Sequence, residues 1–391
     1  MILRIIAVFL GVFQLAASQC SVNIRNDIPV RDPVYLTQQG QLWAPNGAAL
    51  TWNSGQPSFV SCTGSGNSLT FNGQRTSTKT CVSGTNFNIG GSSVTSSNLA
   101  CTNTITGDYS ITGANCGNDG TIINIGFNTY DSPGFVTYIQ SCYSMSTGSV
   151  RYTRHVIPGR AINFAVIESS RPSFKTGGSA PQVSPATSYT QASQMTRLTQ
   201  LLGSQAQAER FLSSSSFMSR GHLAPDGDGI FRSWQFSTYY YTNVAPQWQQ
   251  TNGGNWLRVE NAARQKAHNM QQDLLIFTGT FDILTLPHVN GQQIPLTLEA
   301  GGIEVPKWYW KIIKSTANNA AIALITLNNP FATSISANEL LCTDICSSSG
   351  WGQSNFNNFA HGYTYCCNVM TLRNRITWIP SEASANNVLN W

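Results

Sequence analysis

The ten cysteines of this 391-residue chain lie in two groups near its ends, and this grouping restricts the fold more than any other sequence feature. Each group has an even number, so each end of the chain could be closed by its own disulfides, although the pairing within a group cannot be read from the sequence. A structural zinc site in the second group is the alternative. Disulfides are favoured because the chain has a predicted secretory signal, described below, and because Cys366 and Cys367 are adjacent. The first group is Cys20, Cys62, Cys81, Cys101, Cys116 and Cys142, and the second is Cys342, Cys346, Cys366 and Cys367.

Residues 1–18 have the pattern of a secretory signal peptide. Arg4 precedes an apolar run from Ile5 to Leu15, and the small residues Ala16-Ala17-Ser18 follow it. A membrane anchor would need a longer run, since a bilayer-spanning helix takes about 20 apolar residues. We therefore expect a secreted, extracellular chain with no membrane partner.

The charge of the chain is low and unevenly distributed. Charged residues make up 10% of the sequence, compared with about 25% in an ordinary globular domain. Without the predicted signal peptide the net charge of the chain is +4. Residues 19–125 contain four basic and four acidic side chains, so the whole excess of positive charge lies after residue 125. A mild positive excess permits a polyanionic partner without requiring one.

Residues 19–125 read as a small β-rich domain braced by disulfides. Short apolar or alternating pieces, at Val34–Leu36, Ser68–Phe71 and Thr121–Ile125, are separated by clusters of Gly, Asn and Ser. A lectin-like or substrate-tethering role is one interpretation of this domain. The pattern favours a structural module without catalytic residues, and its role is not readable.

Residues 126–391 are predicted to form a mixed α+β domain. The segment 307–314 alternates in a way typical of a strand with one buried face, although its aromatic residues also allow base stacking. A loop rich in Ser, Thr and Gly at about 173–194 is predicted to be a mobile surface segment. Periodicity predicts helices at 191–202 and 254–272 and strands at 135–139, 149–158, 273–280, 307–314 and 320–327.

Three polar segments of this domain concentrate residues suited to catalysis: 218–228, 241–247 and 251–260. In an extended segment Arg220 and His222 point to the same face, which pairs a fixed cation with a titratable base. Hydrolysis of a phosphodiester needs an activated water and stabilisation of negative charge, for which these two side chains are suited. Asn252 and Glu260, at the start and about two turns into the predicted helix, offer the oxygen ligands that Mg²⁺ prefers.

Each of these residues also has a structural interpretation when taken alone. A single histidine is more often structural than catalytic, Asn252 could cap a helix, and Glu260 could be a solvated helix residue. The run Asp226-Gly227-Asp228-Gly229 lacks the later ligands of a calcium-binding loop and is predicted to be a turn.

The order and spacing of the three segments resemble the DNA/RNA non-specific endonuclease family, whose fold is the ββα-metal or His-Me finger. The family core motif Asp-Arg-Gly-His corresponds to residues 219–222, and its Asn-x-x-Pro-Gln and Asn-x-Gly-x-Trp-x-x-x-Glu segments correspond to 243–247 and 252–260. The resemblance implies a mixed fold with a central antiparallel sheet. The export signal and the cysteine-rich extension are more closely similar to secreted arthropod DNases that prefer double strands.

The resemblance implies a role for five residues. His222 matches the general base, Arg220 a phosphate-stabilising cation, and Asn243 an asparagine that positions the base or the substrate. Asn252 matches the one direct protein ligand of Mg²⁺, for which Mn²⁺ substitutes, and Glu260 a residue that orders the metal's water shell. The implied products carry 5′-phosphates.

Ser219 departs from the pattern, because the family has aspartate at this position. The loss of that charge could change substrate range or metal handling, although the arthropod subgroup also has serine here.

Three other functions remain as alternatives. The first is a nuclease that attacks RNA as well as DNA, because selection against the 2′-hydroxyl is not readable from sequence. The second is a secreted binding protein with an inactive nuclease fold, and the third is a zinc hydrolase. The last is disfavoured because the chain has no His-Glu-x-x-His segment and its other histidines are scattered.

Overall fold

A computed structural model of the chain describes residues 19–129 and 133–391. The predicted signal peptide, residues 1–18, lies outside the described residues. Within the described ranges, no helix is both long and apolar enough to cross a membrane.

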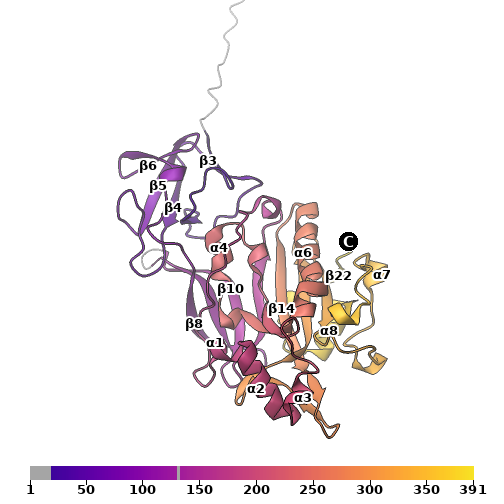
Figure 1. Ribbon diagram of the computed structural model, residues 1–391. Coiled ribbons are helices and arrows are strands. Elements are labelled where there is room, and N and C mark those ends of the chain that lie inside the picture. Colours follow the sequence, from indigo (N-terminus) through magenta and orange to yellow (C-terminus); the bar gives the residue numbers. More distant parts are fainter. Residues whose placement is uncertain (1–18, 130–132) are drawn as a thin grey trace, which may run out of the picture.

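The N-terminal region is a β-rich module, as predicted (Figure 1). Its strands pair antiparallel in a two-stranded and a five-stranded sheet. The smaller sheet has β1 (Gln19–Asn23) and β3 (Ala49–Asn53), and the larger, in spatial order, β2 (Val34–Leu36), β4 (Pro57–Ser61), β5 (Thr76–Ser83), β6 (Asn86–Ile89) and β7 (Ser92–Thr95). The alternating piece Ser68–Phe71 does not form one of these strands; it joins the module through an isolated bridge between Leu69 and Cys101.

The centre of the molecule is one large sheet, which confirms the predicted α+β class with a central antiparallel sheet. All its pairings are antiparallel except the parallel edge contact of β22 with β20. In spatial order it contains β21 (Thr364–Cys367), β20 (Ala320–Leu327), β19 (Pro306–Ser315), β14 (Leu274–Ile283), β11 (Ser149–Ile157), β10 (Phe135–Ser144), β9 (Gly120–Asn128) and β8 (Asp108–Cys116), with β22 (Asn387–Val388) beside β20.

The strands β8 and β9 precede or span residue 125, yet they are hydrogen-bonded into the large sheet. The sheet therefore crosses the boundary that the sequence placed between residues 125 and 126. We propose that the division between module and catalytic region lies instead between β7 and β8.

Hydrophobic cores lie on both faces of the large sheet, as β19 illustrates. Trp308, Trp310 and Ile312 belong to the core around α8, whereas Tyr309 and Ile313 belong to the core beneath α6. The prediction of one buried face is therefore wrong, since both faces are covered. The two tryptophans, 1% and 0% exposed, have no ring surface for base stacking.

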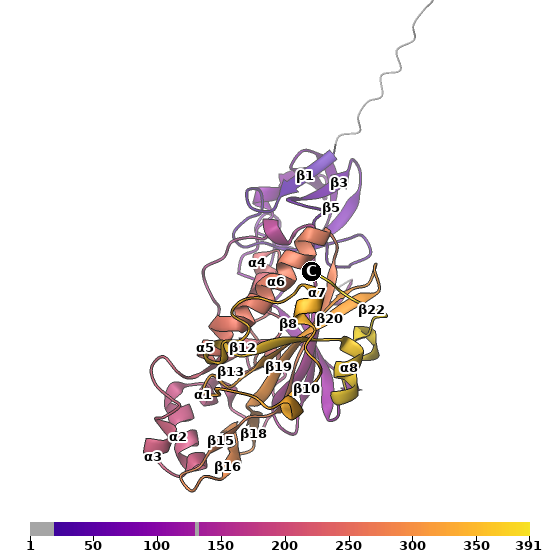
Figure 2. The same ribbon diagram turned by 90° about the vertical axis from the view of Figure 1, so that its right-hand side faces the viewer.

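The helices and short hairpins cover this sheet (Figures 1 and 2). The helix predicted at 191–202 is confirmed; the Thr190 side chain caps its start and Gly203, with φ of 88°, ends it. The helices are α1 (Pro185–Ser188), α2 (Gln191–Leu202), α3 (Gln205–Ala208), α4 (Arg232–Ser237), α5 (Gln249–Thr251), α6 (Leu257–Met270), α7 (Cys346–Ser349) and α8 (Val369–Arg375). The hairpins are β12 (Met218–His222) with β13 (Val244–Trp248), β15 (Thr285–Pro287) with β16 (Gln293–Pro295), and β17 (Thr297–Glu299) with β18 (Gly302–Glu304).

Disulfides join the cysteines within each of the two predicted groups, and none is free. This confirms disulfides rather than a zinc site. The pairs are Cys20–Cys81, Cys62–Cys101, Cys116–Cys142, Cys342–Cys367 and Cys346–Cys366.

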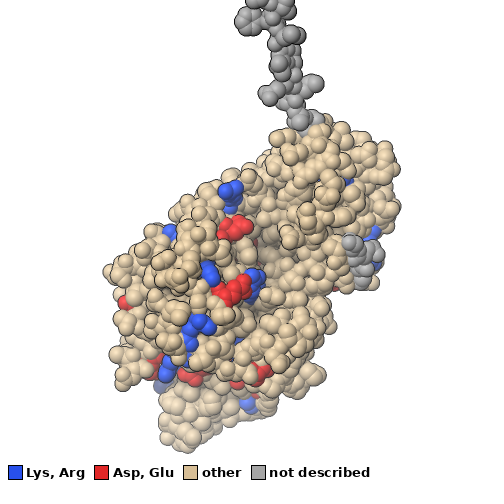
Figure 3. All heavy atoms as spheres, turned by 180° about the vertical axis from the view of Figure 1, so that it is seen from behind, with Lys and Arg blue, Asp and Glu red and all other residues tan. Residues whose placement is uncertain are grey.

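Charged side chains are sparse on the surface. On the face behind that of Figure 1, basic and acidic side chains lie close together and form no extended patch of one sign (Figure 3). That face therefore offers little to attract a polyanion.

Candidate active site

The strand β12 carries the two side chains at the centre of the site. Arg220 and His222 both contact the ring of Phe174, which agrees with the expectation that they share a face. Gly221 lies on the other face, where a Cβ would come within 2.5 Å of the Gln247 side chain and 3.0 Å of the Tyr309 hydroxyl. Glycine is therefore required between the two functional residues.

His222 is held by aromatic rings rather than by hydrogen bonds. Its ring centroid lies 5.2 Å from that of Phe174 and 5.0 Å from that of Tyr239, and its buried Nε2 has no hydrogen-bond partner among the residues that the structure describes. Burial lowers the pKa of His222 to about 4; the charge of Asp226 opposes this shift and that of Arg171 adds to it. The imidazole is therefore neutral at pH 7 and able to accept a proton.

The guanidinium of Arg220 lies among three aromatic rings. It is 5.5, 5.4 and 5.7 Å from the ring centroids of Phe174, Tyr189 and Tyr241, and its Nε donates a hydrogen bond to the Tyr241 hydroxyl at 3.2 Å. A guanidinium has five N–H donors, so four remain for phosphate oxygens. The rings hold the cation in place without neutralising it.

Asn252 begins a widened helical turn, Asn252–Trp256, that leads into α6. The Ser219 hydroxyl donates to the Gln247 carbonyl oxygen at 2.9 Å, so its oxygen accepts from Asn252 Nδ2 at 3.1 Å. This arrangement fixes the amide orientation and leaves Oδ1 free. Gly254 allows the turn, because a Cβ there would lie 2.7 Å from the His361 carbonyl oxygen.

Glu260 lies two turns further along, on the buried side of α6, and is 9% exposed. Within the part of the chain that the structure describes, its carboxylate makes no hydrogen bond. Burial raises the pKa of Glu260 to about 7, although the charges of Lys311 and Arg264 oppose the shift. The Glu260 carboxylate, buried and without a hydrogen bond, and the free Oδ1 of Asn252 are oxygen ligands of the kind that a hard divalent cation prefers. The residues present therefore fit such an ion.

The Asn243 side chain forms hydrogen bonds to backbone groups. Its Oδ1 accepts from the Ala224 N–H at 3.0 Å, and its Nδ2 donates to the carbonyl oxygens of Ala224 and Thr238, both at 2.8 Å. Both Nδ2 hydrogens are used, so the amide has no donor left for a substrate. It can hold the segment that follows His222.

Residues 118–372, about two thirds of the chain, match the family model described as DNA/RNA non-specific endonuclease. The chain belongs to this family. It is therefore a phosphodiester hydrolase of the endonuclease type, whose substrate is nucleic acid and whose family is generally metal-dependent.

Relatives of this endonuclease include insect salivary proteins. A salivary endonuclease of Lutzomyia longipalpis is 29% identical over 95% of this chain and 87% of its own. The salivary protein Tsal2A of Glossina morsitans morsitans is 28% identical over 96% of each chain, and a salivary endonuclease of Culex quinquefasciatus is 26% identical over 83% of this chain and 79% of its own. Among solved structures, the EndoG/EndoGI complex gives a TM-score of 0.34 at 16% identity, covering 51% of this chain and 75% of the other, too low to add to the argument.

A buried ionic network beneath the endonuclease site was missed by the sequence analysis. The turn predicted at Asp226–Asp228 is confirmed as a 3-10 turn, but Asp228 is only 2% exposed. One of its oxygens bonds His155 Nε2 at 2.8 Å and the other bonds Arg264 at 2.9 Å. Burial raises the pKa of Asp228, but the hydrogen bond from His155 and the charge of Arg264 outweigh it and hold the pKa at about 2.

Three further residues of the site lie in segments that were assigned no function. Arg171 makes no hydrogen bond or ion pair among the described residues, and Phe174 contacts both catalytic candidates. Phe174 lies at the start of the loop predicted to be mobile, a loop that in fact packs against the site. Tyr239 contacts His222 and donates its hydroxyl to Asp226 at 2.7 Å. Aromatic residues near a His motif carry no distinct sequence signal.

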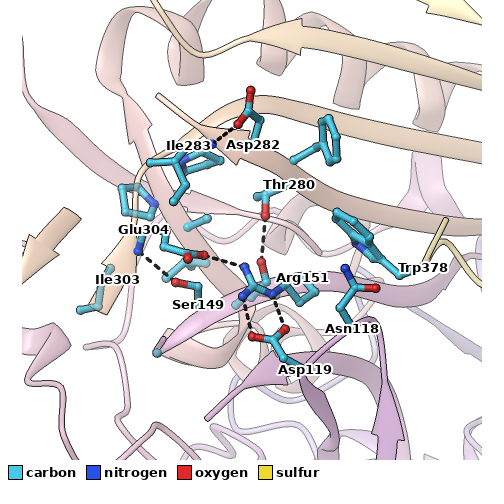
Figure 4. Close-up of a pocket in the computed structure, with 17 residues that line it drawn as sticks. Asn118, Asp119, Ser149, Arg151, Thr280, Asp282, Ile283, Ile303, Glu304 and Trp378 are labelled. Carbon is cyan, nitrogen blue, oxygen red and sulfur yellow. Dashed lines mark hydrogen bonds and ion pairs between the residues drawn. The ribbon is translucent and has the colours of Figure 1, made fainter. Parts of the chain in front are cut away.

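A hollow of about 340 Å³ lies beside β13 (Figure 4), and none of the predicted site residues lines it. Arg151 occupies its centre, where it pairs with Asp119 at 2.7 Å and Glu304 at 2.6 Å. These carboxylates are already partnered, so we do not assign the metal to this hollow.

Proposed function

We propose that this endonuclease is a secreted, magnesium-dependent DNase that prefers double-stranded DNA and leaves 5′-phosphate ends. The observation that carries the proposal is the neutral, partnerless His222 beside Arg220, whose donors are largely free. Five disulfides and salivary relatives support export.

In this mechanism His222 takes the proton from the attacking water, since its imidazole is unprotonated at neutral pH. Arg220 contacts the phosphate oxygens as negative charge builds on them. Asn243 keeps the backbone after His222 in place through its hydrogen bonds to Ala224 and Thr238. As the bond from the water oxygen to phosphorus forms, the bond between phosphorus and the 3′ oxygen breaks; the 3′ oxygen takes a proton from solvent and the phosphate stays on the 5′ side.

Asn252 Oδ1 would hold the magnesium ion, with Glu260 ordering its surroundings and Mn²⁺ as a substitute. When bound, the ion supplies charge stabilisation at the phosphate and at the leaving oxygen. Ser219 contributes by holding the Asn252 amide, so that a neutral hydrogen bond stands where the family aspartate carries a charge.

The test is to incubate the purified mature chain with supercoiled plasmid, single-stranded DNA and RNA in magnesium buffer. We expect the plasmid to be cut fastest, EDTA to stop all cleavage, and the thermal melting curve to show the protein folded in both conditions. Cut ends that a ligase rejoins without prior phosphorylation would support 5′-phosphates. Equal rates on RNA would overturn the DNA preference, and cleavage that survives EDTA would overturn the metal requirement.

A further inference from the structure

A cleft of about 660 Å³ lies where the N-terminal module meets the catalytic region. Arg25 lines it from the module, the segment 162–171 and the Asp226–Gly227 turn line it from beside His222, and Asn261 and Arg264 line it from α6. Figures 1 and 2 show the module against the same end of the catalytic region as α4 and the C-terminal part of α6. The volume is in the range of pockets that enclose a whole small ligand.

We propose that this cleft is a second substrate subsite, in which Arg25 of the module binds the phosphodiester backbone of the DNA strand that flanks the scissile phosphate. The inference rests on the proposed function and extends it to a part of the chain outside the matched family residues, 118–372.

The cleft is continuous with the catalytic base. Tyr239 packs against the His222 ring at 5.0 Å between centroids and donates its hydroxyl to Asp226 at 2.7 Å, and Asp226 lines the cleft. A strand whose phosphate lies at His222 therefore passes close to this cleft.

The cleft has an excess of unpaired positive charge. Glu168 lines the cleft but is paired with Arg232, and Arg264 is paired with Asp228. This leaves the cations Arg25 and Arg171, neither of which forms an ion pair among the described residues, against the single carboxylate of Asp226. The balance favours an anionic ligand.

Two backbone contacts orient the Arg25 side chain. Its Nε and one terminal nitrogen donate to the carbonyl oxygens of Ala165 at 3.1 Å and Asn163 at 2.9 Å. These bonds orient the guanidinium without neutralising it, and three of its five N–H donors remain for phosphate.

The module is attached firmly to the catalytic region. The buried carboxylate of Asp32 accepts from the Ser233 backbone at 3.1 Å and from its hydroxyl at 2.9 Å, at the start of α4. Lys175 donates to the Gly107 carbonyl oxygen at 2.7 Å. A wall fixed in this way can position a phosphate contact, which a flexible tether cannot.

The experiment compares Arg25→Ala with Arg31→Ala, a matched control on the same module. Arg31 is also exposed and also donates to a backbone carbonyl oxygen, that of Thr102, but it does not line the cleft. For Arg25→Ala we expect KM for long duplex DNA to rise about fivefold with kcat unchanged, and the slope of log KM against log salt to fall by about one. Arg25→Lys should restore most of the salt dependence, because it keeps the charge.

Two further measurements separate a lost phosphate contact from a disturbed fold and from failure of the proposed function. Hydrolysis of bis(4-nitrophenyl) phosphate, too small to reach the cleft, should be equal in all variants. Binding of a labelled duplex in EDTA should weaken in Arg25→Ala even without cleavage. If Arg25→Ala matches Arg31→Ala on DNA, or loses small-ester and DNA hydrolysis equally, the inference is wrong; a wild-type chain that binds duplex but cuts nothing contradicts the proposed function instead.

Discussion

Two buried histidines, in neighbouring regions of the molecule, differ in their charged contacts. His155, on the central strand β11, bonds the Asp228 carboxylate through Nε2 at 2.8 Å, whereas His222, on β12, packs against the rings of Phe174 and Tyr239 and has no hydrogen-bond partner for its buried Nε2 among the described residues. The buried Nδ1 of His155 also lacks a partner there. Burial lowers the pKa of both imidazoles. The carboxylate holds His155 in a structural network, whereas His222 has no such partner and its nitrogen stays available for chemistry.

The region around His155 acts as the support for the region around His222. Asp228 follows the base by six residues, and it bonds both β11, through His155, and the helix that carries Glu260, through Arg264. Lys311 adds to this support by donating to the Leu223 carbonyl oxygen at 3.3 Å. The network therefore ties the strand of the base to the helix of the metal-binding candidates.

The largest expected effect is the fall in cleavage rate when His222, the proposed general base, is replaced. We expect His222→Ala to lower kcat for plasmid cleavage by about 10²- to 10⁴-fold, because the variant has no imidazole to accept the proton of the attacking water. His222→Asn, which fills more of the space between the rings but cannot serve as the base, should be equally inactive. Wild-type rates in either variant, with a normal melting curve, would contradict the assignment of His222.

The second effect concerns stability. Asp228→Asn removes the buried charge that pairs with the half-buried Arg264 and bonds the buried His155, and we expect the free energy of unfolding in urea to fall by about 3–5 kcal/mol. Asp282→Asn is the control, because Asp282 is exposed and its one hydrogen bond among the described residues comes from the Ile283 N–H. If the two variants unfold at the same urea concentration, Asp228 does not hold the two regions together.

The smallest effect is a shift in pH dependence. With the pKa of His222 at about 4, kcat/KM at saturating magnesium should stay level as pH falls through 6.5 and decline only near pH 4. Arg171→Gln removes a cation that disfavours protonation of His222, so its pKa should rise and the decline should begin at higher pH. Arg258→Gln, an exposed arginine on α6, should not move it, and a decline near 6.5 in all three proteins would show that burial does not tune the base.

The local parts of this fold were predictable and the long-range parts were not. Periodicity located α2 and α6 and the strands β14, β19 and β20 to within a few residues, because a repeat of 3.6 or 2 residues is a local property. The alternating piece at Ser68–Phe71 does not form a strand of the sheets, and it is joined to its neighbour by an isolated bridge. Periodicity also did not show that β8 and β9 belong to the large sheet, since strand partners are chosen by tertiary packing.

By itself the sequence determined the two groups of cysteines that close on themselves, the α+β pattern, and the placement of Arg220 and His222 on one face of a strand. Only the tertiary structure decided that His222 is buried without a partner, that Asp228 bonds residues 73 and 36 positions away, and that Arg25 reaches carbonyl oxygens about 140 positions along the chain. The physical reason is that pKa values and ion pairs depend on burial. Burial is set by contacts between segments that are distant in the sequence, and their separation along the chain does not indicate which of them come into contact.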